Sequence, residues 1–135
     1  MNIRKLLFAA VAGSALVISA GCQNEAPITG RTDRFDPGWL TLDSTQLRAD
    51  TLVQDAKQSR DESGILHVAV PVRNVTDQQL YVEYILTFKD STGMQVNRYP
   101  GRLTIPARQT RDAVGNASGP SAREFHLELN YPRTN

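Results

Sequence analysis

The feature that most constrains the fold is the two-residue alternation of apolar side chains between Leu80 and Lys89. Every second side chain is apolar or aromatic, from Leu80 to Phe88, and most of the intervening ones are polar or amphipathic. Because successive side chains of a strand point to opposite faces, this pattern predicts a strand with one buried face. Such a strand needs further strands beside it and a second layer over its apolar face.

The same alternation recurs in two other segments. Residues 65–73 place an apolar side chain at every even position, and residues 125–131 place one at every odd position. Pro71 lies in the first segment and cannot donate a ladder hydrogen bond, so we expect it at a sheet edge or a bulge. Turn-forming residues follow at 74–79 and 90–93. Shorter strands are expected at residues 39–42, 47–56, 94–96, 101–105 and 108–114.

Residues 47–56 allow two interpretations. A short helix could bury Leu47, Leu52 and Ala56, whereas Thr51, Leu52 and Val53 favour a strand, and we prefer the strand. About seven strands with turns every 8 to 12 residues predict an all-β sandwich or barrel over residues 38–135.

The amino end has the organisation of an export signal. Arg4 and Lys5 precede an uncharged run that ends at Ala20, and this run is too short for a confident membrane-spanning helix. Two small residues, Ala20 and Gly21, stand directly before Cys22, which is the single cysteine of the chain. An unpaired cysteine is a liability in an oxidising compartment. The alternative is a secreted protein that is cleaved elsewhere and keeps Cys22 as a spare thiol.

The segment Ser19-Ala20-Gly21-Cys22 resembles the lipobox of bacterial lipoproteins, although Leu is commoner than serine at the first of these positions. The resemblance implies cleavage between Gly21 and Cys22 and lipid on Cys22, so that residues 1–21 are a signal peptide. Gln23, in the place where Asp would signal retention, implies delivery to the outer membrane rather than the inner one.

Residues 22–37 are polar, without apolar periodicity, and we expect a lipidated cysteine followed by a flexible tether. The 15 Lys and Arg residues nearly balance the 14 Asp and Glu residues of the chain, and Arg4 and Lys5 leave with the signal. No basic cluster appears, so nucleic acid is not an expected partner. The membrane contact is expected to come from the lipid alone.

The order of elements from residue 38 to 132 is similar to the YcfL-like family of small bacterial lipoproteins. The likeness is carried by ILHVAVPVRNVTDQQLYVEYILTFKDSTGMQV, by RLTIPARQT and by PSAREFHLELNYP. It implies an immunoglobulin-like β-sandwich whose function is unknown, and it supplies no catalytic residue. Leu86-Thr87-Phe88-Lys89 departs from the family, where many relatives have a second aromatic residue next to the Asp.

The expected chemistry is that of a non-enzyme without cofactor or metal. His67 and His126 fall on the polar faces of their strands, and we interpret both as solvent-facing side chains rather than ligands. The serines lie in turns without a histidine nearby in the sequence, so no catalytic group is expected.

The function expected from the sequence is therefore that of an interaction module, held at the outer membrane and facing the periplasm, in envelope assembly or maintenance. Its partner would be a periplasmic protein that contacts a strand edge or the face bearing Tyr81 and Ile85. The alternative is a binding module for cell-wall glycan or a small envelope ligand, which would use the rings of Trp39 and Tyr99. A third hypothesis, a hydrolase, requires histidine, serine and carboxylates in one cleft.

Overall fold

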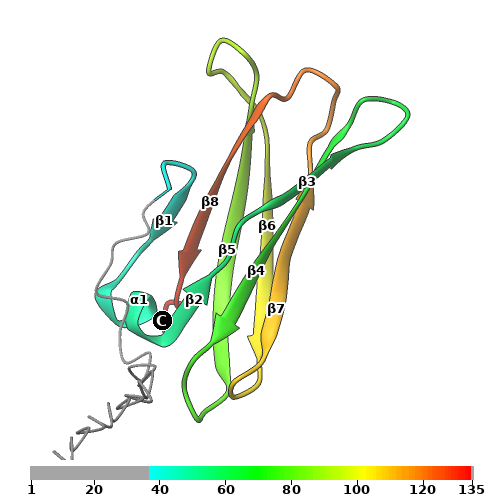
Figure 1. Cartoon of the computed structure of the whole chain (residues 1–135). Coiled ribbons are helices and arrows are strands. Elements are labelled where there is room, and N and C mark those ends of the chain that lie inside the picture. The colour runs from blue at the N-terminus through cyan, green and yellow to red at the C-terminus, as the bar shows by residue number, and fades with distance from the viewer. Residues whose placement is uncertain (1–36, 135) are drawn as a thin grey trace, which may run out of the picture.

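The computed structural model describes residues 37–134, which form two facing β-sheets and one short helix (Figure 1). The expected signal peptide, Cys22 and nearly all of the expected tether lie outside the described residues. Sheet A has the strand order β1 (Leu40–Leu42), β8 (Glu124–Asn130), β5 (Leu80–Lys89) and β6 (Gln95–Ile105). Sheet B has β4 (Leu66–Asn74) at its centre, β7 (Thr110–Asn116) on one side, and β2 (Thr51–Val53) and β3 (Lys57–Arg60) on the other.

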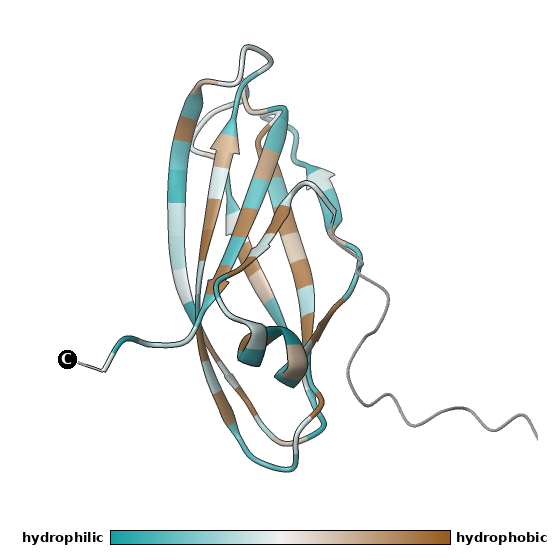
Figure 2. Ribbon diagram, turned by 90° about the vertical axis from the view of Figure 1, so that its left-hand side faces the viewer, coloured by the Kyte–Doolittle hydropathy of each residue, from teal (hydrophilic) through white to brown (hydrophobic). Residues whose placement is uncertain are grey.

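The all-β sandwich expected from the sequence is confirmed, and so are the strands expected from its three alternating segments, which are β4, β5 and β8. β5 has the predicted bounds, and Val82, Leu86 and Phe88 are at most 1% exposed. Alternating apolar and polar residues are visible along the strands in Figure 2. The segments predicted at 94–96 and 101–105 join into the single long strand β6, which pairs antiparallel with β5 from Leu80↔Ile105 onwards.

The expectation that Pro71 lies at an edge or a bulge is wrong, because β4 is the central strand of sheet B. Pro71 is buried and pairs with Asp112 of β7. Its carbonyl accepts from the Gln54 N–H at 2.9 Å, so its backbone nitrogen faces the same side. On that side, the pairing of β4 with β2 has ended and its pairing with β3 has not begun. The missing N–H of Pro71 therefore removes no hydrogen bond from a regular ladder.

The preference for a strand over all of residues 47–56 is also wrong. Thr45–Asp50 forms the helix α1, and the strand β2 begins at Thr51. The Ser44 hydroxyl caps the helix by accepting from the Leu47 N–H at 3.1 Å, and Thr51 donates its hydroxyl to the Leu47 carbonyl. Leu47 is fully buried, so one apolar side chain holds a helix too short to show a period in the sequence.

The two sides of the sandwich between the sheets are closed differently. On the side of β6 and β7, the Tyr84 hydroxyl donates to the Val114 carbonyl at 2.7 Å, and Asn97 donates to the Asn116 carbonyl. On the side of β8 and β3, Arg60 donates to the Ala122 carbonyl at 2.6 Å near one end. α1 lies near the other end (Figure 1).

We expect stability to fall above pH 10 because two tyrosines need their protons in the fold. Burial raises the pKa of Tyr84, and burial together with the Asp50 carboxylate raises the pKa of Tyr131 well above its usual value. Tyr131 donates its hydroxyl to Asp50 at the end of α1. A raised folded-state pKa stabilises the fold fully below the unfolded value of about 10 and loses that contribution as the pH rises further.

The measurement is a series of urea midpoints between pH 8 and pH 11. The wild type should lose stability more steeply above pH 10 than the double variant Tyr84→Phe, Tyr131→Phe, which starts lower but has no such protons to lose. If the urea midpoints of the two proteins fell in parallel with rising pH, the stabilising role of the Tyr84 and Tyr131 hydroxyl protons would be contradicted.

Candidate functional site

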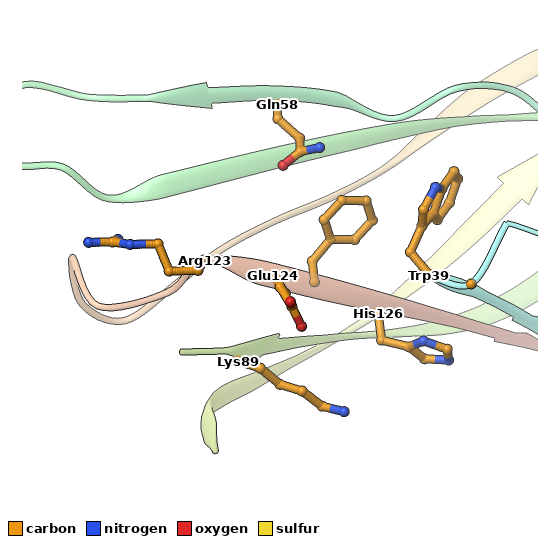
Figure 3. Close-up of a pocket in the computed structure, with 8 residues that line it drawn as sticks. Trp39, Gln58, Lys89, Arg123, Glu124 and His126 are labelled. Atoms are coloured by element: carbon orange, nitrogen blue, oxygen red, sulfur yellow. The ribbon is translucent and has the colours of Figure 1, made fainter. Parts of the chain in front are cut away.

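A hollow opens in the side of the sandwich between β8 and β3, and we call it the side hollow (Figure 3). Its volume is about 380 Å³. It draws on both sheets, since Gln58 belongs to β3 whereas Lys89 and His126 belong to sheet A. The lining residues are Gly38, Trp39, Gln58, Lys89, Arg123, Glu124, Phe125 and His126.

One wall of the side hollow is aromatic. The rings of Trp39 and Phe125 lie with their centroids 5.3 Å apart and their planes tilted by 44°. Phe125 is buried in the core, whereas Trp39 is half-buried and packs against the core from just before β1. Trp39 is held in place by its carbonyl, which accepts from the Leu127 N–H at 2.7 Å. The backbone bond positions Trp39 beside β8, and the ring contact with Phe125 restrains the indole.

The floor of the side hollow includes an unpaired strand edge of sheet A. Leu127 donates to Trp39 and Leu129 accepts from Asp43, so both residues of β8 turn their backbone groups toward β1. Because these groups alternate along a strand, the N–H and C=O of Phe125 point the same way. β1 does not extend to this position, since its pairing with β8 begins at Leu127. Within residues 37–134, the backbone of Phe125 therefore has no strand partner on this side.

The opposite border of the side hollow is the free edge of β3. The Asp61 N–H donates to the Ile65 carbonyl, so Asp61 turns its backbone groups toward the β4 side. By the same alternation, Gln58 turns its backbone groups away from β4 and toward the side hollow. Its amide side chain is exposed and has no hydrogen-bond partner within residues 37–134.

The rim of the side hollow carries charges of both signs with a positive excess. Lys89, Arg123 and Glu124 line the rim, with the Arg123 side chain extending away from Glu124 (Figure 3), and His126 is hydrogen-bonded to the Thr41 hydroxyl at 2.8 Å. Arg123 also donates to the carbonyls of its own loop. Within the described part of the chain, the side chains of Lys89 and Glu124 form no ion pair with each other, although the two residues are opposite in the pairing of β5 with β8. They remain available to a ligand.

Tyr81 and Ile85 lie on the outer face of sheet A, where the sequence placed them. Tyr81 is 58% exposed, and Ile85 is half-buried beside Pro100 in the adjacent strand. They are about 13 Å apart along β5 at roughly 3.3 Å per residue. Glu83 lies between them and pairs with Arg102 at 3.3 Å. The structure therefore brings them onto one face but not into contact.

Trp39 and Tyr99 do not form a common platform. Trp39 precedes β1 at one edge of sheet A, whereas Tyr99 belongs to β6 at the other edge. Tyr99 pairs with the buried Leu86, and a Cβ added at Gly115 would come within 3.0 Å of its ring. Tyr99 is 38% exposed and covers the seam between β6 and β7 rather than presenting a free ring.

The two histidines lie on outward faces of different sheets, His67 on β4 and His126 on β8. His67 is hydrogen-bonded to Asp61 at 3.0 Å, and this bond, with the N–H groups of Ile65 and Ser63, lowers the pKa of the Asp61 carboxyl. Ser59 is opposite His67 in the register, but no hydrogen bond joins their side chains in the described chain. The cleft that the hydrolase hypothesis requires is not assembled from these groups.

Residues 37–134 contain no group of three or more His, Cys, Asp or Glu placed to hold a metal ion. The same residues contain no helix long and apolar enough to cross a membrane.

Most of the side hollow was not predicted from the sequence. Trp39 was singled out as an aromatic contact, but Gln58, Lys89, Arg123 and Glu124 were not. Nothing in their sequence neighbourhoods distinguishes them, because the hollow forms where β3 approaches the start of β8 in space. The one sequence pattern that pointed to this region is the charged Glu124 next to the apolar Phe125 at the start of a strand.

A two-sheet sandwich with a side hollow defines a small all-β domain, and comparisons with known proteins assign its family. Residues 39–131 match the family described as a protein of unknown function, DUF1425, and the chain belongs to this family.

Two solved structures share the fold. A DUF1425 family member from Shewanella sp. is 16% identical, with a TM-score of 0.55, and the match covers 63% of this chain and 81% of that one. The Campylobacter jejuni protein cj0090 is 23% identical, with a TM-score of 0.59, and the match covers 71% of this chain and all of that one. No curated protein matches the chain. These likenesses concern the fold alone.

Proposed function

We propose that the protein is an outer-membrane-anchored periplasmic lipoprotein that acts as a non-catalytic interaction module in envelope assembly or maintenance. The proposed location at the outer membrane rests on the lipobox-like segment that ends at Cys22 and on Gln23 after it. We further propose that it belongs with the YcfL-like lipoproteins, on the three segments of sequence that resemble them. Two or three acyl chains on Cys22 would hold the domain at the membrane essentially permanently.

The observation that carries the docking function is the exposed ring of Tyr81 on the outer face of sheet A. Tyrosine offers a large amphipathic surface at low entropic cost and is enriched at the centres of protein interfaces. The ion pairs of Arg102 with Glu83 and of Arg98 with Glu128 lie on the same face and would form a polar rim. Ile85 and Pro100 supply apolar surface between them.

The edges formed by β1, β3 and β7 are less suitable for a protein partner than this face. β1 spans 3 residues, and β3 spans 4 residues that include Lys57 and Arg60. Short, charged edge strands resist pairing with other chains. The edge of β7 is occupied at Val114 and Asn116 by side chains of sheet A. A partner would therefore gain more from the outer face of sheet A.

The test is photocrosslinking in a diderm host, with a benzoyl-phenylalanine placed at position 81. The matched control is the same group at position 114, because Val114 is 48% exposed on the outer face of sheet B. We expect a discrete crosslinked product at position 81 in the outer-membrane fraction, none at position 114, and loss of the product when Cys22→Ala is added. Equal products at both positions, no product at position 81, or a product unaffected by Cys22→Ala would contradict the proposal.

A second candidate, glycan binding, is favoured by one specific observation. Trp39 presents its ring in a hollow together with polar side chains from two sheets. A small amphipathic ligand requires an apolar wall and a few polar groups, and the side hollow offers both, with its polar side chains on the two sides of β8 (Figure 3).

A further inference from the structure

We propose that the side hollow is a binding subsite for one sugar ring that carries a carboxylate. The inference rests on the second candidate function and names its ligand class and contact residues. It does not depend on protein docking at Tyr81, which is not among the residues that line the side hollow.

The shape and size of the side hollow suit a single ring. Small-molecule pockets have volumes of roughly 300 to 1,000 Å³, and this one has about 380 Å³. Its aromatic wall is fixed by the packing of Trp39 against Phe125. A pyranose has an apolar face of C–H groups and an edge of hydroxyls, so it can contact the indole with one and the polar rim with the other.

The polar groups of the side hollow suit the hydroxyls of a sugar better than the apolar side chains of a protein partner. A hydroxyl both donates and accepts, so a sugar requires donors and acceptors together. Lys89 supplies donors, Glu124 supplies acceptors, and the Gln58 amide supplies both. The backbone N–H and C=O of Phe125 add one more of each at the open edge of β8. None of these three side chains has a hydrogen-bond partner within residues 37–134, so a ligand would displace no internal bond.

The charge at the rim selects an acidic sugar. Lys89 and Arg123 outnumber Glu124 at the rim, so an anion can bind near Lys89, which is unpaired within residues 37–134, while hydroxyls contact the carboxylate of Glu124. Hydrogen bonds that involve a charged group contribute about 1.5 to 3 kcal/mol. A neutral sugar of the same shape should therefore bind about tenfold more weakly.

The experiment is a titration of the full-length protein with two matched disaccharides, followed by the fluorescence of Trp39, the single tryptophan of the chain. The probes are N-acetylglucosaminyl-N-acetylmuramic acid and N,N′-diacetylchitobiose, which lacks the lactyl carboxylate. We expect the first to bind about tenfold more tightly, corresponding to about 1.4 kcal/mol. Absence of binding for both probes at millimolar concentration would overturn the proposal and leave the crosslinking result at Tyr81 unaffected.

Two variants with matched controls locate the subsite. Lys89→Gln should remove the difference between the two sugars, and Gln58→Ala should weaken both about fivefold, the effect of losing one hydrogen bond. Lys57→Gln and Gln54→Ala change the same residue types at exposed positions outside the side hollow and should leave binding unchanged. Equal affinity for the two sugars, or identical losses in variants and controls, would overturn the assignment.

Discussion

Gly101→Ala should lower the free energy of unfolding by about 3 kcal/mol, the upper range for overpacking a core. A Cβ at this position would lie 2.2 Å from Cζ of Tyr84 and 2.4 Å from its hydroxyl oxygen. The ring cannot retreat without cost, because it is buried and its hydroxyl donates to the Val114 carbonyl of the other sheet at 2.7 Å. The added methyl group would therefore separate β6 from the ring and break one of the hydrogen bonds that join the two sheets.

The measurement is equilibrium unfolding in urea, with Gly119→Ala as the matched control. No heavy atom lies within 4 Å of a Cβ built at Gly119, so that substitution should change stability little. Adding Gly101→Ala to the variant Tyr84→Leu should lower the free energy of unfolding by less than adding it to the wild type, because the clash needs both partners. Additive losses in the double variant would show that the ring is not the cause.

The parts of the fold that could be predicted are the strands whose successive side chains point alternately to the core and to solvent. β5, β4 and β8 have inner side chains that are almost fully buried, and their period of two follows directly from that burial. β3 could not be found, because all four of its side chains are exposed and its sequence KQSR has no apolar face. It is a strand because β4 offers it backbone partners, which is information from tertiary structure.

The candidate sites also divide into features that the sequence period predicts and features that depend on tertiary structure. The exposure of Tyr81 could be predicted because it is out of phase with the buried side chains of β5. The inward position of Tyr99 could not, since its half of β6 mixes polar and apolar residues and its phase is set by the pairing with Leu86. Gln58 and Phe125 are far apart in the sequence, so the side hollow between them depends on how the two sheets pack.

Asn74→Asp should destabilise the fold even more than Gly101→Ala, with a loss of about 4 kcal/mol at neutral pH, as for a buried charge without its partner. Asn74 is fully buried at the end of β4. Its amide donates to the carbonyls of Gln78 at 2.6 Å and Ile105 at 2.9 Å, and its carbonyl accepts from the N–H and hydroxyl of Thr76. An aspartate has the same shape but turns an anionic oxygen toward carbonyl oxygens.

The pH dependence of this variant separates charge from shape. Once protonated, the new carboxyl group could donate again to one carbonyl, so the folded state would hold its proton more tightly than the unfolded chain, which releases it near pH 4. The deficit relative to wild type should therefore be smallest below pH 4 and should grow as the pH rises. Asn74→Ala, which loses the same bonds without gaining a charge, should show a deficit that does not change with pH. A constant deficit for Asn74→Asp between pH 3 and pH 7 would contradict the prediction, because it would mean that the charge of the new carboxylate does not cause the loss of stability.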